Sequence, residues 1–211
     1  MRDDRLGGIA LIAGTAGLLV TMGFHPAGHE LFAPGQLESK SALATAVHAL
    51  AIACLPVLFL GALALARRLA GPDRLAIAAL VAYGLASVAG LAAATVSGFV
   101  SVEMARGMMT GAAEHRDAFG VALHLSGALN QGFAKVLGVA SSAAIALFSG
   151  AILASRALPR ALGVCGLLVG IAIVAALVLG FLRLDVHGFG LVVLVQGAWF
   201  VAAGVLLRRP R

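Results

Sequence analysis

The chain has 211 residues, of which 61% are hydrophobic and 11% charged, with a mean hydropathy of +1.04. Soluble domains carry about 25% charged residues, so this composition excludes a soluble globular protein and predicts a polytopic membrane protein. The net charge of +6 and the pI of 10.7 do not indicate nucleic-acid binding. The basic residues lie at helix ends, not in a clustered face interleaved with aromatic residues. We expect no nucleic-acid partner, with the lipid bilayer as the surroundings.

Apolar runs separated by short polar segments predict an all-α integral membrane protein with six transmembrane helices. About 20 residues are enough to cross the hydrocarbon layer. We expect the first run to be a retained helix, because its 19 residues exceed the ~7–15 of a signal-peptide apolar region. The chain, 1–211, then forms a single polytopic membrane domain. The predicted spans are 6–24, 41–66, 75–100, 134–154, 161–182 and 189–207.

The basic residues predict the orientation of these helices. Ten of the fifteen Lys and Arg residues fall in four polar segments on one side of the six alternating spans, namely Arg2, Arg5, Arg67, Arg68, Arg74, Arg156, Arg160, Arg208, Arg209 and Arg211. Segments rich in Lys and Arg stay in the cytoplasm. We therefore expect both termini to be cytoplasmic, in a bacterial plasma membrane.

The opposite side holds all six histidines and six of the nine acidic residues, so any special chemistry is expected on an outward, histidine-rich face. Helices two to four are longer than a span requires, which predicts that they extend into an outer cap. Residues 117–133 either continue the fourth helix upward or form a separate interfacial helix. Either way, Asp117, His124, Gln131 and Lys135 share one helical face.

These residues predict a candidate site at the outer boundary. His25 and His29 are four residues apart, a spacing that lets two imidazoles on one helix chelate a transition metal. An irregular loop with two solvated histidines is the alternative, because Gly28 and Pro34 lie nearby. His48 and His124 are the further predicted metal ligands. The predicted substrate-binding residues are Glu103, Gln131 and Lys135, charged or polar groups near lipid that need partners.

Small residues recur every four positions in two of the predicted helices. They are Gly138, Ser142, Ala146, Gly150 and Ala154 in the fourth, and Ala86, Gly90, Ala94 and Gly98 in the third. Such repeats let helix backbones approach closely in lipid, either within the chain or in a homo-oligomer or membrane-protein complex. We expect Gly7, near the end of the first helix, to matter less.

No sequence motif identifies a function, and whether the chain is an enzyme stays open. Three hypotheses remain. The favoured one is binding or transport of a cation or small solute through an outward-facing His/carboxylate pocket. The second is a non-catalytic accessory or scaffold protein that uses its small-residue faces. The third is a redox protein or enzyme that contains a transition metal or haem b, with His48 and His124 as axial ligands.

Overall fold

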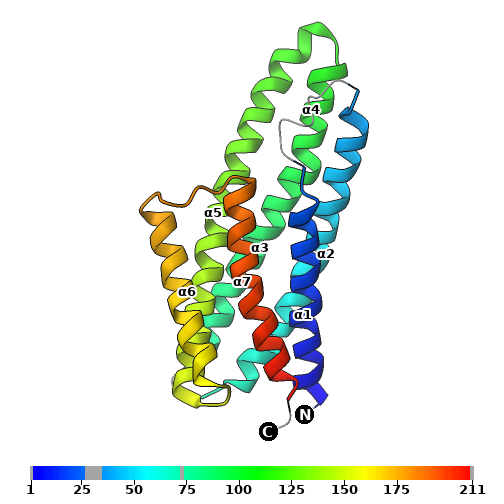
Figure 1. The fold of residues 1–211 in the computed structure, drawn as a ribbon. Helices are drawn as coiled ribbons and strands as arrows, with labels where there is room; N and C mark the ends of the chain where they lie inside the picture. Colours follow the sequence, from blue (N-terminus) through cyan, green and yellow to red (C-terminus); the bar gives the residue numbers. More distant parts are fainter. Residues whose placement is uncertain (1, 27–34, 72–73, 210–211) are drawn as a thin grey trace.

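The computed structural model describes residues 2–26, 35–71 and 74–209. These residues form helices and connecting segments without strands, and six helices are long and apolar enough to cross a membrane. The predicted six-helix, all-α class is therefore confirmed. Both termini lie at the same end of the bundle (Figure 1). We call this the terminal end, and the opposite end the distal end.

The helices match the predicted spans and extend several of them. In chain order they are α1 (Arg2–Gly23), α2 (Leu37–Arg68), α3 (Leu75–Thr95), the π-helix η2 (Val96–Val100), α4 (Ser101–Thr110), the 3-10 turn η3 (Ala113–His115), α5 (Arg116–Ser155), α6 (Arg160–Val178) and α7 (Val186–Leu207).

One helix decides between two sequence-based alternatives, and another ends earlier than predicted. α5 is one continuous helix of 40 residues, so 117–133 is not a separate interfacial helix. α6 ends at Val178, four residues before the predicted end, because Gly180 has a φ of +75°, a left-handed conformation that terminates helices.

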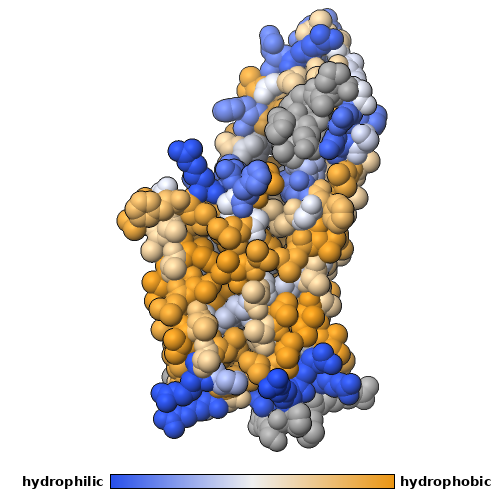
Figure 2. All heavy atoms as spheres, viewed as in Figure 1, coloured by the Kyte–Doolittle hydropathy of each residue, from blue (hydrophilic) through white to orange (hydrophobic). Residues whose placement is uncertain are grey.

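The six long helices pack side by side. α3 lies against α5, α1 packs between α2 and α7, and α6 sits at the periphery against α5. Beyond the distal ends of α6 and α7, α4 and the first part of α5 project as a hairpin beside the start of α2 (Figure 1). On the face shown in Figure 2, apolar residues cover the middle of the bundle, with hydrophilic residues at the terminal end and on the projection. This distribution is that of an integral membrane protein.

Small residues permit close helix contacts, as predicted for the small-residue repeats. A Cβ added to Gly170 of α6 would lie 2.6 Å from the carbonyl oxygen of Ser142 on α5. The expectation for Gly7 was wrong, because a Cβ there would overlap the Cβ of Ala64 on α2. α1 and α2 also approach closely at Gly14, whose added Cβ would lie 2.9 Å from the Cβ of Leu58.

The half of the bundle nearest the termini is filled by side chains. Leu11, Leu65 and Phe148 have no exposed surface there. The rings of Phe148 and Trp199 stack with centroids 6.5 Å apart, and the indole N–H of Trp199 donates to the carbonyl of Leu162 at 3.1 Å. At the terminal end itself, Arg68 of α2 pairs with Asp4 of α1 at 2.6 Å. This half is therefore a dry, packed core.

Candidate functional site

The distal half contains a cavity of about 190 Å³ between α1, α2, α3, α5 and α7, which we call the central cavity. Its lining includes His48 and Leu58 of α2, which are ten residues apart, so the cavity is roughly 15 Å deep at ~1.5 Å per helical residue. Gln131 and Asp185 also line it and are exposed, so it reaches the surface at the distal end. Most of the other lining side chains are apolar, including Leu18, Leu55, Leu137, Phe189, Val193 and Phe200.

Two histidines, His25 and His48, meet at the wall of this cavity and form what we call the histidine pair. His25 follows the end of α1, and His48 lies on α2 with 5% of its surface exposed. Their Nε2 atoms are 3.1 Å apart, and the rings contact edge to face. Nδ1 of His48 lies 2.6 Å from the carbonyl of Ala44, and Nδ1 of His25 lies 2.9 Å from that of Pro26.

The π-helix η2 makes room for His48. A Cβ at Gly98 would overlap the Cβ of His48, so a side chain at position 98 would displace the imidazole. In this π-helical turn the backbone N–H of Ser101 donates to the carbonyl of Val96, five residues earlier. The hydroxyl of Thr45, one turn before His48 on α2, donates to the carbonyl of Gly98 at 3.0 Å. α2 and η2 are thus held together directly beside the histidine pair.

A second group of polar side chains lies deeper in the cavity. Ser141 of α5 donates to the amide oxygen of Gln196 on α7 at 2.9 Å, and the amide nitrogen of Gln196 donates to Ser142 at 2.8 Å. Thr15 of α1 also lines the cavity and is 2% exposed, and its hydroxyl has no partner among the described residues. The floor therefore offers a free hydroxyl in an apolar wall.

The mouth of the cavity is built from α5 and the start of α7. The side-chain amide of Gln131 donates to the carbonyl of Leu184 at 3.1 Å. Asp185 caps α7, its Oδ1 accepting from the backbone N–H of Gly188 at 2.8 Å.

Burial lowers the pKa of the His25 imidazole, and its hydrogen bond to Pro26 raises that pKa by a smaller amount.

The other predicted site residues lie elsewhere. The cavity brings together His25, His48 and Gln131, but His124 and Lys135 are exposed on α5 and do not line it. His29, like Glu30, lies outside the described residues. Glu103 does not line the cavity either.

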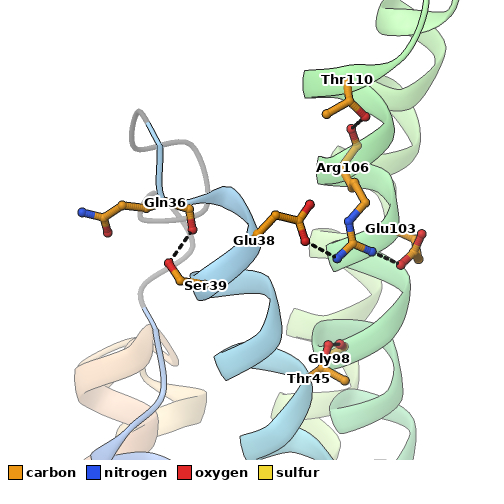
Figure 3. A network of polar contacts seen from close by, with 8 residues as sticks. All are labelled: Gln36, Glu38, Ser39, Thr45, Gly98, Glu103, Arg106 and Thr110. Carbon is orange, nitrogen blue, oxygen red and sulfur yellow. Dashed lines mark hydrogen bonds and ion pairs between the residues drawn. The ribbon is translucent and has the colours of Figure 1, made fainter.

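Glu103 belongs to an ion-pair network on the projection. Arg106 of α4 contacts Glu103 at 2.5 Å and reaches Glu38 in the first turn of α2 at 3.4 Å. Figure 3 shows the guanidinium between the two carboxylates, on the facing sides of α2 and α4. Exposed ion pairs contribute little stability individually, so this network orients the helices more than it stabilises them.

The described residues do not provide the metal or haem site considered from the sequence. No three His, Cys, Asp or Glu side chains among them are grouped closely enough to hold a metal ion. Two axial nitrogens on opposite faces of a haem lie about 4 Å apart, each about 2 Å from the iron. The predicted axial ligands were His48 and His124, but His124 is exposed on α5 and does not line the cavity that His48 borders. The histidine pair does not fit a haem either, because its Nε2 atoms are 3.1 Å apart and its rings are in direct edge-to-face contact.

Several important residues were missed by sequence reasoning. Thr15 and Thr45 have no sequence signal beyond being weakly polar in an apolar run, and Gly98 was recognised only as part of a small-residue repeat, not as the neighbour of His48. Gln196 and Ser141 were recognisable as polar groups needing a partner in lipid, but not as partners of each other. Pairing of His25 with His48 depends on the contact between α1 and α2, which helix periodicity does not predict.

The site is a cavity with the histidine pair near its mouth. At its floor lies the buried hydroxyl of Thr15, which has no partner among the described residues. Comparison of the chain with protein-family models, with curated proteins and with solved structures finds no match. The function is therefore inferred from the geometry of this site.

Proposed function

We propose that the protein binds a small, mainly apolar solute in the central cavity, which the solute enters from the distal end. The observation that carries this proposal is the hydroxyl of Thr15, 2% exposed and without a partner among the described residues, in the cavity wall. A buried polar group without a hydrogen bond costs about 1–3 kcal/mol. A solute with an acceptor or hydroxyl at its inner end removes that cost.

The size and lining of the cavity support a small molecule. A cavity of about 150 Å³ in another protein binds benzene, and the central cavity is somewhat larger, at about 190 Å³. Drug-sized ligands occupy about 300–1,000 Å³, and haem is at least as large. A solute with an apolar body and one or two polar groups suits this space better than a hydrated metal cation, since Asp185 is the one carboxylate in the described lining.

The basic residues support an orientation in which the terminal end faces the cytoplasm and the cavity opens outward. The packed core of the terminal half then closes the cavity on the cytoplasmic side. Such an arrangement suits uptake or sensing of a solute from outside the cell. The glycines of the small-residue repeats face neighbouring helices of the same chain, namely α2, α3, α5 and α6, so they provide no observation that favours a scaffold role.

The test is a thermal-shift screen of the purified full-length protein against small amphipathic solutes. A solute that binds the native state raises its stability by about 2.7 kcal/mol at a hundred times its dissociation constant. Ala93→Phe fills the cavity wall on α3, whereas Ala78→Phe adds the same ring to an exposed position of the same helix. We expect at least one solute to stabilise the wild type and Ala78→Phe but not Ala93→Phe. A screen in which every stabilising solute also acts on Ala93→Phe would contradict binding in this cavity.

A further inference from the structure

The polar contacts of the histidine pair together need one hydrogen more than two neutral imidazole rings carry. Three contacts join ring nitrogens to other atoms: His48 Nδ1 to Ala44 O, His25 Nδ1 to Pro26 O, and Nε2 to Nε2. Carbonyl oxygens only accept hydrogen bonds, and two bare Nε2 atoms repel each other, so each contact needs one hydrogen. Two neutral imidazoles supply two hydrogens, one short of three.

We propose that His25 and His48 together form a binding site for one proton, held between their two Nε2 atoms, and that this proton joins the end of α1 to α2 beside the cavity. The proton comes from water at the distal end and forms a bond to one Nε2, which then donates to the other. The pair gains one positive charge. This site is independent of the proposed solute, because its ligand is the proton itself.

Loss of the proton has a defined structural consequence. With two hydrogens left, both can stay on Nδ1, so that each ring keeps its carbonyl contact. The contact then lost is the one between the Nε2 atoms, and it is the only one of the three that links separate helical segments. Deprotonation therefore releases His25 from α2, while His48 stays bonded to Ala44 within its own helix.

The surroundings contain few other charges. Thr21 of α1 faces α2 here, its hydroxyl donating to the carbonyl of Val47, and η2 presents Gly98. From α5 the lining near the mouth offers the neutral Asn130 and Gln131. Apart from the histidine pair, the described lining contains two ionisable side chains. Asp185, at the start of α7, lies near the mouth, and Tyr83 lies at the floor.

The pH range follows from burial. The pKa of His25 is lowered from its ordinary value of 6.5, chiefly because burial disfavours the charged ring. The pair is therefore expected to take up its proton below pH 6.5 and to be neutral, with the Nε2 contact open, above it.

Nitrogen-15 NMR of the full-length, histidine-labelled protein in lipid nanodiscs tests the proposal between pH 8 and pH 4.5. Single His→Gln variants assign the signals, after EDTA treatment to remove metal. We expect His25 and His48 to titrate in one joint step that takes up a single proton. In His25→Gln the joint step disappears and His48 titrates alone, whereas His115→Gln in an exposed turn leaves the joint step unchanged.

Two independent steps, one for each ring and both near pH 6.5, would overturn the proposal. So would survival of the joint step in His25→Gln, or a stoichiometric metal that resists EDTA and shifts both Nε2 signals. His25 lies beyond the last residue of α1, so its substitution removes a ring without altering a helix. The number of protons taken up in the joint step is measured on the wild-type protein, so this test does not depend on the folding of any variant.

Discussion

The two halves of this bundle differ in packing. In the terminal half, the side chains of Leu11, Leu65 and Phe148 pack between the helices and have no exposed surface. In the distal half the same helices enclose a cavity of about 190 Å³, with hydroxyls, amides and imidazoles in its wall. Because lipid tails are as apolar as the core, helices associate in membranes through close packing and hydrogen bonds. We therefore expect the terminal half to contribute most of the stability, because the distal half leaves a cavity between its helices.

The largest expected difference comes from removing the same ring in each half. Phe148→Ala empties a site with no exposed surface, and we expect it to cost about 3–5 kcal/mol of unfolding free energy. Phe189→Ala on α7 only enlarges the existing cavity, so we expect a loss of about 1 kcal/mol. Unfolding by denaturant in mixed micelles measures both. Equal losses would mean that the distal half is packed as tightly as the terminal half.

A change in a close helix contact, at the level of the cavity floor, tests helix packing in the opposite sense. Gly14→Leu forces α1 away from Leu58 of α2, and we expect a loss of about 1–3 kcal/mol, as for other overpacked sites. Gly132→Leu on α5 is the matched control, since an added Cβ there meets nothing within 4 Å. The control should be neutral or slightly stabilising, because Gly is a poor helix former. Thermal stability in detergent compares the two, and tolerance of Leu at position 14 would contradict the close α1–α2 packing.

A smaller effect is expected from the polar floor of the cavity. Gln196→Leu removes two hydrogen bonds, to Ser141 and Ser142, but the hydroxyl of Ser141 can then donate to the carbonyl of Leu137, and that of Ser142 already donates to the carbonyl of Gly138. Hydrogen bonds between membrane helices contribute about 0.6 kcal/mol on average, so we expect a loss of about 1 kcal/mol. Denaturant unfolding, with Val193→Ala as a neighbouring cavity control, measures it. A loss above that of Phe148→Ala would show that the amide is a main structural support.

The smallest change in stability is expected at Thr15, with a sign opposite to the others. Thr15→Val replaces the unpartnered hydroxyl by a methyl group of similar size, so without solute the variant should be equal to or slightly more stable than the wild type. It should also bind a solute that has an inner polar group more weakly, whereas Thr15→Ser should restore binding. A clear destabilisation by Thr15→Val in solute-free protein would show that the hydroxyl already has a partner.

The overall class was predictable because it depends on local features of the chain. Long apolar runs predicted the six helices, and the repeat through Ser142 and Ala146 predicted close packing of α5, where Gly170 of α6 indeed approaches. The continuity of α5 was not predictable, since its first half is amphipathic enough to lie at an interface. Gly7 was misjudged because distance from the centre of a span says nothing about which neighbour a residue meets.

The candidate site was harder to predict because it depends on contacts between helices. Polarity in an apolar run singled out His48 and Gln131, and both line the cavity. The one-face pattern on α5 also selected His124 and Lys135, but that stripe runs along the exposed side of the helix at those positions. Which side of a membrane helix faces a cavity depends on its neighbours, and those are set by packing in three dimensions.

The most direct test of the difference between the halves is labelling of single cysteines by a membrane-impermeant thiol reagent. Ala134→Cys faces the cavity on α5, and Ala144→Cys lies ten residues further along the same helix in the filled core. In a protein with Cys54 and Cys165 replaced by alanine, we expect Ala134→Cys to react from the distal side of sealed vesicles and Ala144→Cys to react from neither side. Reaction of Ala144→Cys, or protection of Ala134→Cys from both sides, would contradict a cavity that opens at the distal end and is closed by the terminal core.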